Sequence, residues 1–115
     1  MPTPSTHNYE LLGKTLLDMG IAMIHAGAPT RRVNLVLVRI ATAFGCQIHH
    51  QMTTRHLSIS LYADNLTVFN GGISMSTLPM VNFQLVSDIS DMSLRVKEEK
   101  PTLEQLQSYL TQLHA

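Results

Sequence analysis

Tryptophan is absent from this chain of 115 residues, aromatic side chains make up 5% of it, and there is one cysteine, Cys46. A single cysteine excludes an internal disulfide and is typical of a reducing compartment. Because aromatic rings are scarce, aliphatic side chains and seven methionines must fill the core. The formal net charge is zero, whereas free nucleic-acid binders usually carry a strong basic excess. We therefore expect no nucleic-acid partner.

Long uncharged apolar runs are missing as well. No run reaches the roughly 18 residues that a membrane-spanning helix needs, and the start, MPTPSTHNYE, lacks the basic and apolar regions of a signal peptide. The charge is uneven, because residues 1–63 hold five basic and two acidic residues and residues 64–115 hold three and six. This asymmetry can orient a partner or a second copy, or reflect complementary halves of one fold. The length suits one domain, residues 1–115.

The first third of the chain predicts two helices. Residues 7–26 show an apolar stripe at helical spacing, with Ser5 or Thr6 as the N-terminal cap and Gly27 as the terminator. The second helix follows Pro29, with Thr30 as its N-cap, and stops at Gly45. The expected inward residues are Leu12, Leu16, Met19 and Met23 in the first helix, and Val33, Val36 or Leu37, Ile40 and Phe44 in the second.

After Cys46 the apolar period changes to two, which predicts strands. In one run, Leu57, Ile59 and Leu61 should face the core. Turn chemistry at 53–55, at 63–65 and at Gly71-Gly72 would separate four strands. They are residues 46–52, 56–62, 66–69 and 73–79.

Helical spacing returns in the last third of the chain. Leu85, Ile89, Met92 and Val96 form one stripe, Pro101 breaks it, and Thr102 to Gln105 reads as a capping box before a closing helix. The order ααββββαα predicts an α+β fold, a small antiparallel sheet packed with about four helices.

No catalytic motif stands out. The sequence has no Walker loop, GxSxG or HExxH pattern. His49 and His50 would point to opposite faces of a strand, so at most one joins His56, and structural zinc prefers four ligands. We expect no metal and no cofactor. Cys46 follows a helix C-terminus, which favours a small core residue over a nucleophile.

Asp88 and Asp91, three apart on a helix, can share a face and do acid–base work, or form a solvated surface. A stand-alone, hydrolase-like enzyme using them or the histidines is therefore one alternative, and a dimerisation module is another.

Two adjacent arginines at a predicted helix start are the best candidate site. Arg31 and Arg32 lie where the helix already carries partial positive charge. With Thr30 and the free amides of the first turn, they can bind a small carboxylate, a phosphate or an acidic partner. The alternative is that they pair with a carboxylate such as Asp18 or extend into water.

Short segments spread along the chain also form an ordered pattern. They are Ala26-Gly27-Ala28, Thr30, Arg32-Val33, Arg39-Ile40-Ala41, Phe44-Gly45, Asn82-Phe83 and Thr102-Leu103-Glu104-Gln105. The pattern resembles the N-terminal domain of the threonine/serine exporter (ThrE-like) family, whose signature is similar to G-A-x-T-x-R-V, then R-I-A, then a small-residue stop. The resemblance covers nearly the whole chain.

This resemblance implies a soluble domain on the cytoplasmic side of the inner membrane, with a regulatory, assembly or substrate-proximal role. Its partner would be a membrane-spanning portion of the same protein or a separate subunit, and we expect a homo-oligomer. The family is associated with export of threonine and serine, and two-subunit relatives with export of dicarboxylates such as succinate. Arg32 matches the recurrent arginine of the family, whereas Asn34 stands where many members have Glu.

Overall fold

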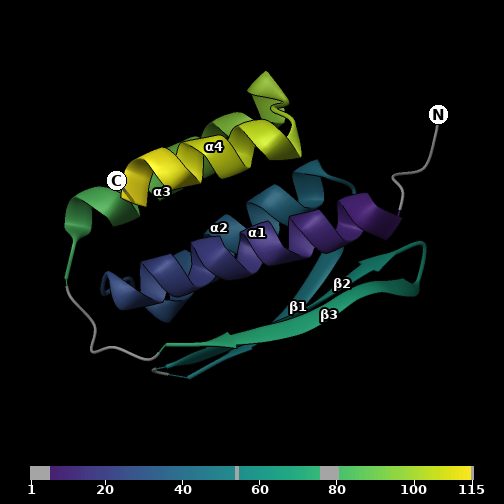
Figure 1. The fold of residues 1–115 in the computed structure, drawn as a ribbon, viewed down its shortest axis with the longest axis horizontal. Coiled ribbons are helices and arrows are strands. Elements are labelled where there is room, and N and C mark those ends of the chain that lie inside the picture. Colours follow the sequence, from purple (N-terminus) through teal and green to yellow (C-terminus); the bar gives the residue numbers. More distant parts are fainter. Residues whose placement is uncertain (1–5, 54, 76–80, 115) are drawn as a thin grey trace.

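A computed structural model describes residues 6–53, 55–75 and 81–114 of the chain. These residues form four helices and a three-stranded antiparallel sheet, which is the predicted α+β class (Figure 1). The elements are α1 (Thr6–His25), α2 (Thr30–Ala43), β1 (Gln47–Met52), β2 (His56–Ala63), β3 (Leu66–Ser74), α3 (Phe83–Glu99) and α4 (Leu103–His114).

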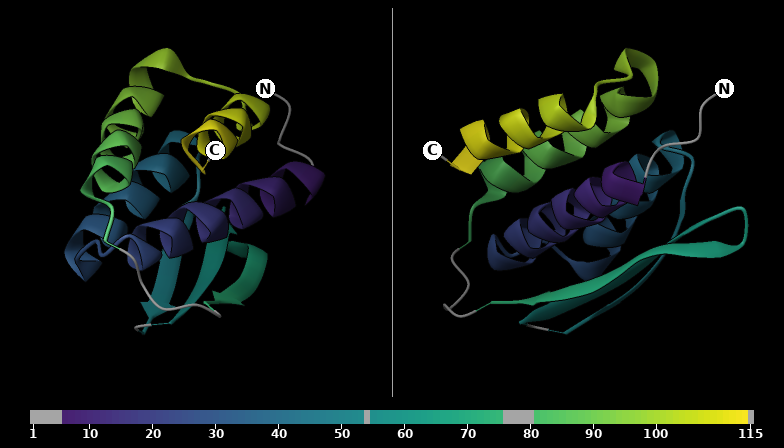
Figure 2. Two further views of the ribbon diagram at one scale, coloured as in Figure 1. Left: turned by 60° about the vertical axis from the view of Figure 1, so that its left-hand side comes forward. Right: turned by 45° about the vertical axis from the view of Figure 1, so that its right-hand side comes forward.

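The elements stack in three layers. The sheet lies on one side, α1 and α2 form the middle layer, and α3 and α4 cover the helices from the far side (Figures 1 and 2). Helix α1 contacts β2 and β3 below it and α3 and α4 above it. A helix covered on two sides must be apolar around most of its circumference, and α1 buries all four predicted residues, Leu12, Leu16, Met19 and Met23.

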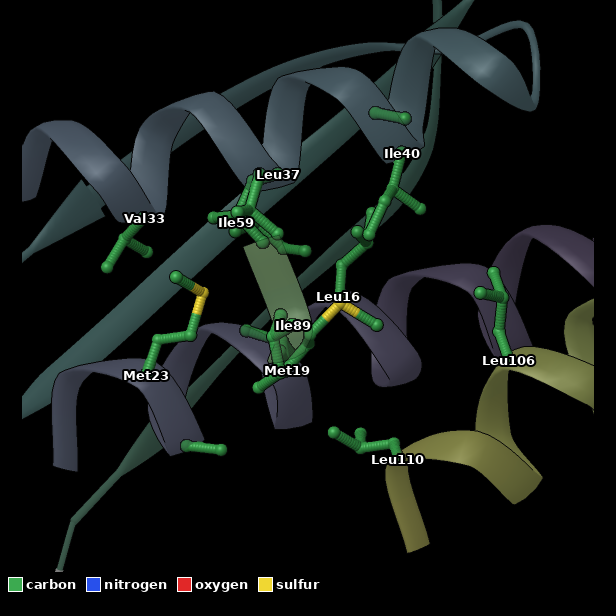
Figure 3. Close-up of a cluster of buried hydrophobic side chains, with 14 of the residues drawn as sticks. Leu16, Met19, Met23, Val33, Leu37, Ile40, Ile59, Ile89, Leu106 and Leu110 are labelled. Carbon is green, nitrogen blue, oxygen red and sulfur yellow. The ribbon is translucent and has the colours of Figure 1, made fainter. Parts of the chain in front are cut away.

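One continuous core joins the layers. Figure 3 shows Leu16, Met19 and Met23 of α1 meeting side chains of α2, of the sheet and of the two last helices. The predicted inward residues of α2, except the half-buried Phe44, are fully enclosed, as are those of β2. The labelled partners of α1 in that view are Val33, Leu37, Ile40, Ile59, Ile89, Leu106 and Leu110.

Among the described residues the sheet has three strands, so the prediction of four strands is wrong. Instead of turning at Gly71-Gly72, β3 continues to Ser74, with Gly71 opposite Ile59 and Gly72 opposite Ser58. A Cβ at Gly71 would lie 2.9 Å from the Phe69 ring. The glycines therefore provide space inside the strand, a role that glycine also takes where groups approach closely. Residues 76–79 of that prediction lie outside the described residues.

The turn predicted at 63–65 is confirmed. Asp64 and Asn65 have positive φ values of 52° and 66°, and they join β2 to β3 as a two-residue hairpin loop. Positive φ at both positions is the requirement of the type I′ turn, which Asn and Asp tolerate better than most residues.

Helix ends agree with the sequence in most places. Gly27 and Gly45 have φ values of 90° and 80° and follow α1 and α2 as left-handed terminators. Asn82 caps α3 by accepting from the Leu85 amide at 3.0 Å. The capping proposed for Ser5 or Thr6 lies outside the described side chains.

The predicted N-cap of α2 is wrong by one position. Thr30 is the first helical residue, Pro29 occupies the N-cap, and no side chain caps this end. The Pro29 carbonyl accepts from the amides of Arg32 and Val33 at 3.0 and 3.2 Å. Proline suits this place because it has no N–H to leave unpaired and its φ, here −63°, is already set.

Candidate functional site

Thr30, Arg31 and Arg32 form the first turn of α2, and all three are exposed. The Pro29 carbonyl occupies the amides of Arg32 and Val33, which leaves those of Thr30 and Arg31 as the open donors of this turn. Within the described part of the chain, the ion pairs join Lys14 to Glu10 and Arg95 to Glu99 and involve neither arginine. Both guanidinium groups are therefore available to an external anion.

The start of α3 lies at the same end of the molecule as this turn of α2 (Figure 1). The Asn82 amide donates to the Ala26 carbonyl at 2.9 Å, which holds the start of α3 against the end of α1. Val81 and Phe83, on either side of Asn82, are 67% and 74% exposed. One end of the molecule therefore combines two cations with two uncovered apolar residues, a combination typical of a contact surface for another molecule.

His49 and His50 lie on opposite faces of β1, as predicted for neighbours in a strand. His49 is exposed on the outer face of the sheet, where its ring meets Tyr62 edge-on at 5.5 Å. His56 is also exposed, and its Nδ1 lies 2.8 Å from the Ser74 hydroxyl. Among the described residues, no three His, Cys, Asp or Glu gather as a metal site would require.

His50 faces the helices and contacts Asn34 of α2. Its Nε2 lies 2.6 Å from the amide oxygen of Asn34. Because that oxygen can only accept, Nε2 carries the proton, and Nδ1 is buried without a partner among the described atoms. Burial, followed by the neighbouring His49, holds the pKa of His50 below its ordinary value. A carboxylate in place of the Asn34 amide would favour the charged form of the His50 ring instead.

The remaining candidates are Cys46, Asp88 and Asp91. Cys46 is buried in the core as predicted, and burial raises the pKa of its thiol, so a reactive thiolate is disfavoured. Asp88 accepts a hydrogen bond from Gln84 at 2.8 Å, while Asp91 is exposed.

The structure adds a feature that the sequence did not indicate, a groove where α2 meets α3. Arg39 of α2 donates from Nη1 to the Ser93 hydroxyl of α3 at 3.4 Å. Beside this contact lies a half-open, mostly apolar groove of about 770 Å³. The sequence shows Val38 and Arg39 next to each other in the predicted second helix, but nothing in it indicates a groove. Their relation to Ser93 requires the packing of α3.

These features define a class, a small α+β domain with a cationic helix start and an apolar groove. No described helix is long and apolar enough to cross a membrane. Residues 14–115 match the family model of the threonine/serine exporters, ThrE, and the chain belongs to this family. It is a family of transporters, not of enzymes. Searches among curated proteins and among solved structures returned no match.

Proposed function

We propose that this chain is the part of a threonine/serine exporter that lies outside the membrane, on the cytoplasmic side of the inner membrane, and that it docks on the membrane-spanning part. The observation that carries the proposal is the arrangement of the four helices, whose apolar faces meet in one core with the sheet. A domain that buries its apolar side chains internally needs no lipid to fold. The family match supports a role in export.

The docking surface in this proposal is the end of the molecule formed by Thr30, Arg31, Arg32, Val81 and Phe83. The exposed guanidinium groups suit a carboxylate of the membrane-spanning part, or a small carboxylate that reports on the substrate. A free anion would bind weakly here. A helix start offers roughly 0.3–1 kcal/mol to a negative group, and a charge-assisted contact about 1.5–3 kcal/mol. This sum corresponds to millimolar affinity, which suits docking or sensing.

An export assay tests the function. Cells that lack the gene would be loaded with threonine, with serine or with succinate, and efflux would be followed after expression of the chain together with its membrane-spanning part. We expect faster efflux of threonine or serine with the wild-type chain. Unchanged efflux of all three compounds would contradict the proposal.

A double variant, Arg31→Gln with Arg32→Gln, tests the docking surface. Arg95→Gln serves as its control, because Arg95 is exposed on α3 and pairs with Glu99 on the same helix. The docking variant should lose co-purification with the membrane-spanning part, and the control should keep it. Equal recovery of both would show that the cationic turn is not the docking surface.

A further inference from the structure

The groove between α2 and α3 is formed by the C-terminal halves of both helices and the turn after α3. The two helices run in the same direction, since Asn82 contacts Ala26 near their starts and Ser93 contacts Arg39 further along. Its volume of about 770 Å³ is within the range of small-molecule sites, roughly 300–1,000 Å³. The lining residues are Val38, Arg39, Thr42, Ala43, Phe44, Ser93, Leu94, Val96, Lys100 and Pro101.

The lining combines apolar side chains with charges of one sign only, which are positive. Leu94 is 57% exposed and Val38 40% exposed, so both present apolar surface to water. Arg39 and Lys100 supply two cations, and the described lining contains no Asp or Glu to neutralise them. An occupant that covers the exposed apolar surface and neutralises the two cations must be apolar along most of its length and negatively charged at one point.

Arg39 is positioned to meet that negative charge. The guanidinium is half-buried, and its one hydrogen bond among the described residues is the 3.4 Å contact with the Ser93 hydroxyl. Ser93 in turn donates to the Ser90 carbonyl at 2.7 Å, which fixes the hydroxyl as an acceptor for Arg39. A guanidinium has five N–H donors in a rigid fork that matches a carboxylate, so most of its donors remain for a ligand.

Lys100 provides an independent observation. It stands at the C-cap of α3 in the left-handed conformation, with φ 47° and ψ 54°, where glycine is the favoured residue. A lysine here benefits from the negative end of the helix, and its side chain also lines the groove. Replacing Lys100 by glycine therefore separates its role as the left-handed C-cap from its role as a cation of the groove, because glycine suits the backbone but carries no charge.

We infer that this groove binds an amphiphilic carboxylate, with the aliphatic body against Val38, Phe44 and Leu94 and the carboxylate at Arg39 and Lys100. Threonine and serine have too little apolar surface to fill a groove of this kind, so the ligand differs from the exported amino acids. Binding in the groove would occur in the isolated chain and does not depend on transport. The efflux assay and the ligand titration therefore give independent results. Either export or binding in the groove can fail while the other is observed.

Titration of the labelled chain with octanoate, followed by ¹H–¹⁵N NMR, tests the inference. We expect saturable shifts confined to the groove residues of α2, α3 and the turn at Lys100. Arg39→Gln should weaken binding at least tenfold. Lys100→Gly should weaken it several-fold while the melting temperature stays the same or rises, so this variant remains informative if Arg39→Gln fails to fold. Arg95→Gln, on α3 but outside the groove, should bind as the wild type.

A cation of equal length, octylammonium, distinguishes charge recognition from simple apolar adsorption. Octanoate should bind at least tenfold more tightly, and equal binding of the two probes would overturn the inference. Absence of saturation by octanoate would also overturn it. If the chain instead self-associates, and Leu94→Asp abolishes association without any octanoate binding in the wild type, the groove is an interface between copies and the inference is wrong.

Discussion

At the scale of single residues, the two arginines in the first turn of α2 are electrostatically unfavourable for their own helix. Arg31 and Arg32 repel the positive end of α2, and both are exposed without an ion pair among the described residues. Since neither guanidinium holds other elements together, their contribution to stability should be small.

The variant Arg32→Gln tests that conclusion. We expect the free energy of unfolding to change by no more than about 0.5 kcal/mol, as is usual for an exposed side chain, while binding to the membrane-spanning part is lost. Thermal denaturation and co-purification measure the two quantities. A drop of a few kcal/mol in stability without any detectable ligand of the wild type would assign Arg32 a structural role instead.

His50 and Asn34 give a second prediction at this scale. Because burial lowers the pKa of His50 in the folded state, the unfolded chain binds more protons as the pH falls below about 6.5. The stability that the neutral ring contributes is therefore complete above that pH and is lost as the pH falls towards the lowered pKa. The melting temperature of the wild type should drop more between pH 7.5 and pH 5.5 than that of His50→Gln.

Asn34→Asp reverses the sign of the effect. A carboxylate at the position of the amide oxygen, 2.6 Å from Nε2 in the wild type, favours the charged ring. NMR titration of the His50 ring should give a higher pKa in Asn34→Asp than in the wild type. An unchanged pKa would mean that the two side chains are not in contact in solution.

At the scale of elements, local signals decide where helices begin and end, and close packing decides which glycines are needed. The capping box predicted at α4 is complete, with both of its reciprocal hydrogen bonds. The Thr102 amide donates to Oε1 of Gln105 at 2.9 Å, and the Gln105 amide donates to Oγ1 of Thr102 at 3.2 Å. Gln105→Ala should cost about 1 kcal/mol of stability. Gln112→Ala, exposed later in α4, is the control in chemical denaturation and should change little.

Gly13 provides the second prediction at this scale. Alanine in place of glycine inside a helix usually stabilises by about 1 kcal/mol. In α1, however, the new Cβ would overlap the Phe69 ring of β3, so Gly13→Ala should destabilise the domain by roughly 1–3 kcal/mol. Adding Phe69→Leu should restore part of the loss. Stabilisation by Gly13→Ala alone would contradict the close packing of α1 on the sheet.

At the scale of the whole molecule, the charges of the two halves of the sequence and the exposed apolar residues favour association. We predict a symmetric dimer or higher oligomer, since opposite charges and uncovered apolar surface can complement each other between copies. Light scattering at low ionic strength should give a mass above 12.8 kDa, and added salt should lower it. A strict monomer at high concentration would contradict the prediction.

Features that depend on neighbouring residues follow from the local sequence. Helical spacing, the left-handed glycines, the Asp64-Asn65 turn and the capping box of α4 each involve residues within a few positions of one another, and each agrees with the structure. The family also follows from the order of short segments. The site could be predicted as far as the arginine pair at a helix start, since that too is a local pattern.

The remaining features arise only when the elements pack against one another. Local chemistry at Gly71-Gly72 predicts a turn, because it does not show that the Phe69 ring and β2 need the space. The contact of Asn34 with His50 joins α2 to β1, and the groove requires Arg39, Ser93 and Lys100 together. Residues distant in sequence meet only when burial of the shared core fixes the layers relative to one another. No local propensity carries that information, because the free energy that selects the arrangement belongs to the packed core as a whole.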